Sequence, residues 1–135
     1  MILANELRLG NYINYKGEAI KITMIGEYGV QSKNKDVIIN AKFSTPDLSP
    51  IPLTEKKLLN CGFVKHKAYR AGGQDEWSGM LAWSIPSNRL FSNWLFRGNA
   101  SCLHLVGYIN TQIEYLHQLQ NLYYELTGEE LNIQL

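Results

Sequence analysis

Histidine and carboxylate side chains are the first candidates for chemistry in this chain. Glu114 and His117 have the spacing at which di-iron helices place a carboxylate and an imidazole on one face. Such centres need a second copy of the pair and further carboxylates from neighbouring helices, and the chain has one copy. A solvated polar stripe is therefore the favoured interpretation. His66 and His104 have no local ligand spacing, so we expect no metal site and no cofactor.

The sequence gives little support for nucleophilic or acid–base catalysis. Cys61 precedes Gly62 at the end of an expected short helix, where the helix dipole raises a thiol pKa and so disfavours the thiolate. We expect Cys61 and Cys102 to be buried free thiols. Asp75 and Glu76 are adjacent, but a polar hairpin tip is favoured over an acid–base pair. The chain has no G-x-S-x-G, P-loop or G-x-G-x-x-G motif, so we predict no catalytic residue.

Aromatic residues offer a ligand pocket as a rival hypothesis. A small enzyme could line such a pocket with Trp77, Trp83 and His104. Large aromatic rings bury much area and most often belong to the core. The core interpretation is therefore favoured, and the pocket stays an alternative.

Lysines alternate with tyrosines in the N-terminal part of the chain. Small bent sheets bind single strands through basic grooves and aromatic platforms. The candidates for such binding are Lys16, Lys21, Lys33, Tyr12 and Tyr15, and the same stretch also holds Lys35, Lys42 and Tyr28. The chain has 13 Lys and Arg against 12 Asp and Glu, a formal net charge of +1. Bulk charge therefore cannot hold nucleic acid strongly, and we expect weak binding at a local patch.

Periodicity and turn residues predict an α+β fold for these candidates. Short strands and frequent glycine turns over residues 1–45 are typical of an SH3-like small β-barrel or meander. Residues 46–53 contain prolines that exclude a central strand, so we interpret them as a connector. Residues 54–135 are then expected to form an antiparallel sheet with two helices, in the order α-β-β-β-β-α. The two parts can also form one compact unit.

Both helices of the second part have start and stop signals. Thr54 is the expected N-cap of a short helix that turns Leu58 and Leu59 inward and ends at Gly62. The long helix should run from an N-cap at Asn110 to Gly128. Its apolar arc consists of Tyr115, Leu116, Leu119, Leu122, Tyr123 and Leu126. The opposite face carries Glu114, His117, Gln118, Asn121 and Glu125, so we expect the core to lie on the leucine side.

The chain of 135 residues, 45% hydrophobic, is long enough for a core without staples. It has no N-terminal leader pattern and no apolar run near the length of a membrane span. We therefore expect a cytoplasmic protein without membrane contact, either a monomer or a small homo-oligomer.

Three segments together resemble a known family. They are Asn5-Glu-Leu-Arg-Leu-Gly-Asn11, then Pro50-Ile-Pro-Leu-Thr-Glu55, and finally Leu116-His-Gln-Leu-Gln-Asn-Leu-Tyr123 with Leu126-Thr-Gly-Glu-Glu-Leu131. This pattern is similar to that of a family of short proteins found around prophages and other mobile elements of gut anaerobes. The resemblance covers both ends and the connector, but not residues 64–105. It implies a cytoplasmic accessory protein and assigns no activity or site.

The favoured function is a non-catalytic binding module of a phage or mobile element, for protein or single-stranded nucleic acid. The alternatives are the small enzyme with an aromatic pocket and a structural protein that self-associates through surplus leucine and tyrosine surface on the last helix.

Overall fold

The computed structural model describes residues 2, 4–67, 81–84, 96–97, 103–105 and 112–134, and it confirms a mixed α+β fold. The chain divides into two compact units. Unit 1 comprises Met1–Pro52 and Tyr115–Leu131, and unit 2 comprises Leu53–Glu114 and Asn132–Leu135. The division after Pro52 lies near the end of the expected connector. The last helix, however, groups with the N-terminal strands instead of with residues 54–135.

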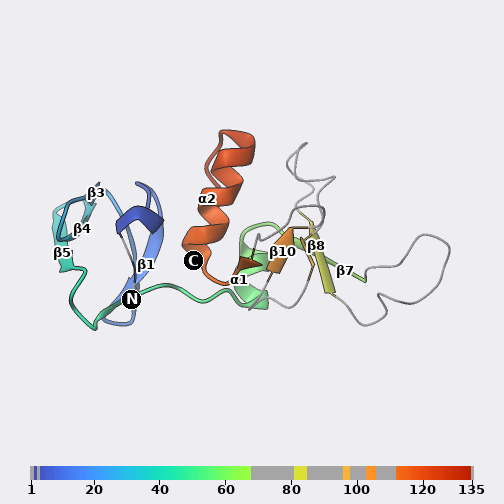
Figure 1. Ribbon diagram of the computed structural model, residues 1–135, viewed down its shortest axis with the longest axis horizontal. Helices are drawn as coiled ribbons and strands as arrows, with labels where there is room; N and C mark the ends of the chain where they lie inside the picture. The colour runs from blue at the N-terminus through green and yellow to red at the C-terminus, as the bar shows by residue number, and fades with distance from the viewer. Residues whose placement is uncertain are drawn as a thin grey trace. The chain divides into compact units, whose positions relative to one another are not determined.

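Unit 1 contains two three-stranded antiparallel sheets (Figure 1). The first has the order β2-β1-β6, with β1 at Tyr12–Tyr15, β2 at Glu18–Lys21 and β6 at Leu48–Ser49. The second has the order β3-β4-β5, with β3 at Met24–Ile25, β4 at Gly29–Asn34 and β5 at Val37–Lys42. A short 3-10 turn, η1, covers Ala4–Glu6. The described pairings keep the sheets separate and do not close a barrel, so the short bent strands are confirmed and the SH3-like barrel is not.

The turn between β1 and β2 follows directly from its residues. Lys16 has φ 52° and Gly17 has φ 83°. Two successive positive φ values are typical of the type I′ turn, whose twist matches that of the flanking strands. The turn aligns Ile13 with Ile20 across the two strands.

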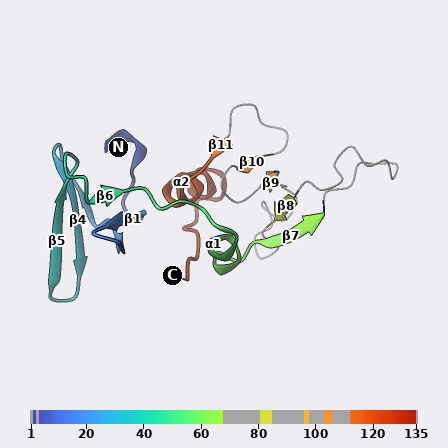
Figure 2. The ribbon, with the colours of Figure 1, turned by 90° about the horizontal axis from the view of Figure 1, so that it is seen from below.

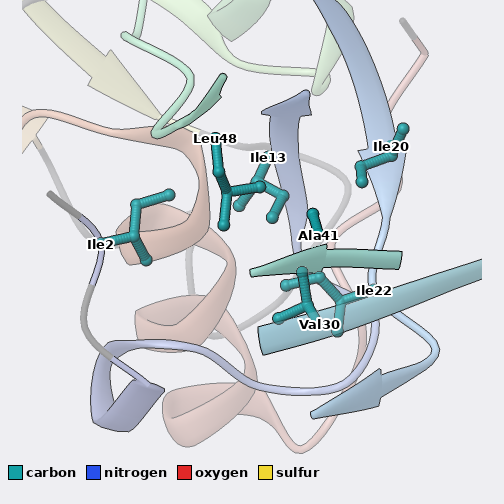
Figure 3. Close-up of a cluster of buried hydrophobic side chains, with 7 residues drawn as sticks. All are labelled: Ile2, Ile13, Ile20, Ile22, Val30, Ala41 and Leu48. Carbon is teal, nitrogen blue, oxygen red and sulfur yellow. The ribbon is translucent and has the colours of Figure 1, made fainter. Parts of the chain in front are cut away.

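The core of unit 1 lies between its two sheets. Figure 3 shows the buried side chains that form it, with Ile13 and Ile20 from the first sheet and Val30 and Ala41 from the second. Ile2, Ile22 and Leu48 complete the cluster. The expected connector thus contributes to the core through Leu48 and also forms an edge strand, so it is packed into unit 1 for most of its length.

The long helix α2, at Leu116–Thr127, begins later than expected. Asn110, the predicted N-cap, lies outside the described residues, and Gln112–Ile113 form a strand, β11. The backbone N–H of Leu116 donates to the carbonyl of Ile51 at 2.9 Å. The helix ends as predicted, because Gly128 has φ 73° and its N–H donates to the Tyr124 carbonyl at 2.7 Å.

The buried face of α2 is wider than the leucine arc. Leu116, Leu119 and Tyr123 are buried, as expected. His117 and Gln120 are buried as well, at 2% and 1% exposed. The expectation that His117 lies on a solvated face is therefore wrong, because the buried face of α2 extends from the leucine arc to His117.

Unit 2 contains the short helix α1, at Glu55–Asn60, and a five-stranded antiparallel sheet. Thr54 caps α1 as predicted, with its side chain accepting from the Lys57 N–H at 3.2 Å. Leu58 is fully buried, but Leu59 is 52% exposed, so only one of the two leucines turns inward. The sheet has the sequential order β11-β10-β9-β8-β7, with β7 at Val64–Lys67, β8 at Leu81–Ser84, β9 at Phe96–Arg97 and β10 at Leu103–Leu105. β11 is a fifth strand where the sequence predicts four.

Neither described helix combines the length and the apolar character needed to cross a bilayer.

Candidate binding surface

Polar contacts join the segment before β1 to α2 within unit 1. Asn11, which is fully buried, donates from Nδ2 to Oδ1 of Asn121 at 2.9 Å. Asn121 in turn donates from Nδ2 to the carbonyl of Glu6 at 2.9 Å. The backbone N–H of Arg8 donates to Oδ1 of Asn11 at 2.8 Å. Residues at opposite ends of the sequence therefore hold each other through side-chain amides.

Gln120 completes the edge of β1. Its Oε1 accepts from the backbone N–H of Tyr12 at 2.9 Å, and its Nε2 donates to the carbonyl of Gly10 at 3.1 Å. A carboxamide offers one acceptor and two donors, so it pairs with backbone groups as a neighbouring strand would. Further along the same strand, β6 pairs with Asn14 and Tyr15. The buried amide thus satisfies backbone groups that β6 is too short to reach.

An ion pair lies at the C-terminal end of this contact. The guanidinium of Arg8 donates to both carboxylate oxygens of Glu130, at 3.0 Å in one of the two bonds, and lies 4.1 Å from the centroid of the Tyr124 ring. The hydrogen bond from Arg8 lowers the pKa of Glu130. Both side chains retain solvent exposure, so the pair contributes little to stability.

His117 is the buried titratable group of this region. Its ring stacks on that of Tyr115 with centroids 6.0 Å apart, and neither ring nitrogen has a hydrogen-bond partner in the part of the chain that is described. Burial lowers the pKa of His117, and the charge of Glu6 partly opposes this shift. Glu114 precedes α2, so the helical spacing that would pair it with His117 does not apply. Among the described residues, no three His, Cys, Asp or Glu side chains gather as a metal site would require.

The five nucleic-acid candidates are distributed over both sheets of unit 1. Tyr12 is the cross-strand neighbour of Lys21. Tyr15 packs partly against the core, and the ammonium of Lys16 lies 5.3 Å from the centroid of its ring. Lys33 belongs to the other sheet. Tyr12 and Tyr15 are both half-buried.

A more accessible basic surface lies on the β3-β4-β5 sheet. Strand alternation divides the sheet into an inner face, with Val30, Ser32 and Ala41 buried, and an outer face. The outer face consists of Met24, Gln31, Lys33, Ile38, Asn40 and Lys42. Met24 is 57% exposed and Ile38 is 53% exposed. This face therefore combines two lysines with accessible aliphatic side chains and contains no carboxylate.

Tyr28 directly precedes β4 and lies near the Lys42 end of the outer face. At 75% exposed it is the most accessible large hydrophobic side chain among the described residues. It lines a shallow hollow together with Glu27, Lys42, Phe43 and Ser44. Tyr28 and Lys42 belong to the lysine–tyrosine pattern of the sequence. The strand register across the Lys35–Asp36 turn places Lys42 on the same face of the sheet as Lys33.

The residues suggested for an enzyme pocket or catalysis gain no support from unit 2. Trp77, Asp75, Glu76 and Cys102 lie outside the described residues. The register places Trp83 opposite Phe96 and His104 opposite Arg97, which are adjacent rows of the sheet. Burial raises the pKa of Cys61 to about 11, which disfavours the thiolate as expected, although through desolvation.

In comparisons with known proteins, the chain matches no family model, no curated protein and no solved structure.

Proposed function

We propose that this chain is a non-catalytic binding module for single-stranded nucleic acid, and that it binds through the outer face of the β3-β4-β5 sheet. The observation that carries the proposal is the combination of Lys33 and Lys42 with exposed apolar side chains on a face without carboxylates. Accessible apolar side chains grouped on one face are typical of interaction sites.

The outer face and the residues beside it suit different parts of a nucleotide chain. The two lysines would neutralise phosphates, with Lys35 in the adjoining turn as a third cation. Tyr28 offers a ring for base stacking, which contributes about 1–3 kcal/mol per base. Met24 and Ile38 offer apolar contact for sugars and base faces. None of these contacts reads a base edge, so binding should be tolerant of sequence.

The expected binding is weak and sensitive to salt. With three lysines on phosphates and about 0.7 counterions released per phosphate of a single strand, the slope of log K against log salt should be roughly −2. The net charge of +1 adds no strong long-range attraction.

The resemblance of the chain to short mobile-element proteins supports the wider setting of this proposal. In that setting the module acts in the cytoplasm for a phage or another mobile element. The two small sheets of unit 1 would then serve as an opened variant of an SH3-like barrel, a fold compatible with strand binding.

Titration of a labelled oligonucleotide at two salt concentrations tests the proposal. Lys33→Glu/Lys42→Glu should weaken binding by about tenfold or more, because it reverses the charge of the outer face. Lys16→Glu/Lys21→Glu is the matched control, with the same change in net charge on the β1–β2 hairpin. Equal losses in both variants would show that bulk charge is responsible. Absence of binding by the wild-type protein at low salt would disprove the nucleic-acid proposal and favour a protein partner.

A further inference from the structure

Among the described strands, β5 has a neighbour on one side alone. β5 is six residues long and lies at the end of the order β3-β4-β5, with β4 as its neighbour (Figure 2). The two-residue turn makes Asn34 and Val37 the first pair of the hairpin, and the N–H of Phe43 donates to the Tyr28 carbonyl at 2.8 Å. In an antiparallel pair, alternate residues bond to the same neighbour. The odd-numbered residues of β5 therefore bond to β4, and the N–H and C=O groups of Ile38 and Asn40 point away from it.

The usual protections of an edge strand are missing from most of β5. Natural edges carry charges, prolines or bulges that prevent another strand from pairing. Residues 37–41 contain none of these, and Lys42 is the only charged residue of the strand. Val37 and Ile38 are 60% and 53% exposed. The strand is also as long as a typical paired strand.

We propose that β5 pairs antiparallel with β5 of a second copy of this chain, with the two Asn40 residues opposite each other. Only residues 38, 40 and 42 direct backbone groups outward, and Asn40 is the centre of that set. Twofold symmetry is the commonest arrangement of homo-oligomers. The register gives mutual backbone bonds between the two Asn40 residues and between Ile38 and Lys42 of the second copy.

The proposed register avoids like-charge pairs. Each Lys42 lies opposite an Ile38, so no lysine of one copy lies opposite a lysine of the other. The carbonyl of Lys42 already accepts from the Thr45 N–H at 3.1 Å, but a carbonyl has a second lone pair for the new bond. The asparagines at the centre are neutral and can pair with each other.

The pairing goes beyond the proposed function, because it concerns a partner of the edge and not of the outer face. It would form one continuous six-stranded sheet from two copies. The twofold axis is perpendicular to the sheet, so both outer faces lie on the same side. The lysines of two copies would then form a single longer basic surface.

Solution mass as a function of concentration, measured without nucleic acid, tests the pairing independently of nucleic-acid binding. The wild-type mass should rise toward twice the chain mass. Ile38→Lys places a lysine opposite Lys42 of the second copy at two symmetric positions and should weaken dimerisation by about tenfold, since like charges directly opposite are destabilising. Ile38→Lys/Lys42→Glu makes both positions oppositely charged and should restore the dimer.

Ile38 lies opposite Lys33 in its own hairpin, so Ile38→Lys also places two lysines opposite each other within one copy, and Ile38→Lys/Lys42→Glu keeps that pair and controls for it. Val37→Lys controls for the added charge, because Val37 lies opposite Asn34 and is similarly exposed. It should weaken dimerisation less than Ile38→Lys does. Circular dichroism of each variant separates loss of pairing from loss of the fold. A wild-type protein that stays monomeric at all concentrations would overturn the proposal. A dimer that survives Ile38→Lys unchanged would also overturn it and would direct attention to another surface, such as that of α2.

Discussion

The two three-stranded sheets of unit 1 have opposite relations to their surroundings. In the β2-β1-β6 sheet, β1 has a strand on each side, and the amide of Gln120 pairs with backbone groups beyond the end of β6. In the β3-β4-β5 sheet, β5 has an unpaired edge and the outer face is exposed. The first sheet is thus completed by the protein's own C-terminal helix, whereas the second ends at β5 in the part of the chain that is described.

This difference explains which residues look distinctive in the sequence. A buried polar group must find a specific partner, so the contact with α2 requires residues such as Asn11, Gln120 and Asn121 at fixed positions. A solvent-exposed face imposes no such requirement, and lysines with aliphatic residues are sufficient there. The contact with α2 therefore depends on particular residues, and the proposed binding surface lies where residue type is less constrained.

The largest expected effect comes from the apolar contact of α2 in unit 1. Leu119 is fully buried, so Leu119→Ala should lower the free energy of unfolding by about 2–5 kcal/mol through lost burial and a residual cavity. Leu59→Ala is the control, since Leu59 is 52% exposed and should lose far less. Urea denaturation measures both. Equal stabilities of Leu119→Ala and the wild-type protein would show that α2 is not docked as described.

A smaller loss of stability should distinguish the two sheets of unit 1. Gln120→Met keeps the size of the side chain but leaves the Tyr12 N–H and the Gly10 carbonyl without their partner, which should cost about 1–3 kcal/mol. Gln31→Met is the matched substitution in the other sheet. Its side chain also makes a hydrogen bond, to Asn40 at 2.8 Å, but in an exposed position, so the change should stay within about 0.5 kcal/mol. Similar losses in both variants would contradict the contrast between the sheets.

Sequence patterns predict those parts of the fold that depend on neighbouring residues in the chain. The cap at Thr54, the end of α2 at Gly128 and the burial of Leu116, Leu119 and Tyr123 follow from residue type and periodicity, and all are confirmed. The predicted start of α2 is wrong, because Gln112–Ile113 pair with β10 as a strand instead of continuing the helical pattern. The burial of His117 and Gln120 depends on contacts that the helix's own pattern does not contain.

The candidate binding surface can also be predicted from the sequence only in part. Alternation within the β4–β5 hairpin is enough to place Lys33 and Lys42 on one face once the turn at Lys35–Asp36 is known. The half-burial of Tyr12 and Tyr15 results from packing between elements, which residue type alone does not reveal. The exposed tyrosine, Tyr28, differs from them in lying in the turn between Gly26 and Gly29, whereas they lie in β1.

The smallest effect concerns the pH dependence of the contact with α2. Burial lowers the pKa of His117 below its ordinary value of 6.5, with the charge of Glu6 as a partial offset. The unfolded chain therefore binds a proton that the folded imidazole resists. The contribution of His117 to the free energy of unfolding should be fully present above about pH 6.5 and should decline as the pH falls below that value. In His117→Leu, unfolding free energies at about pH 7.5 and about pH 5.5 should differ less than in the wild-type protein.

Glu130 provides a control in a separate pH window. Its hydrogen bond with Arg8 lowers the pKa of Glu130 below the ordinary value of 4.5, so this contribution is present above about pH 4.5 and is lost as the pH falls further. Glu130→Gln should leave the difference between about pH 7.5 and about pH 5.5 unchanged. If His117→Leu keeps the full wild-type difference between these two values, the imidazole must have a partner for its proton in the folded state. The buried contact between α2 and the rest of unit 1 would then accommodate the protonated imidazole more readily than its burial indicates.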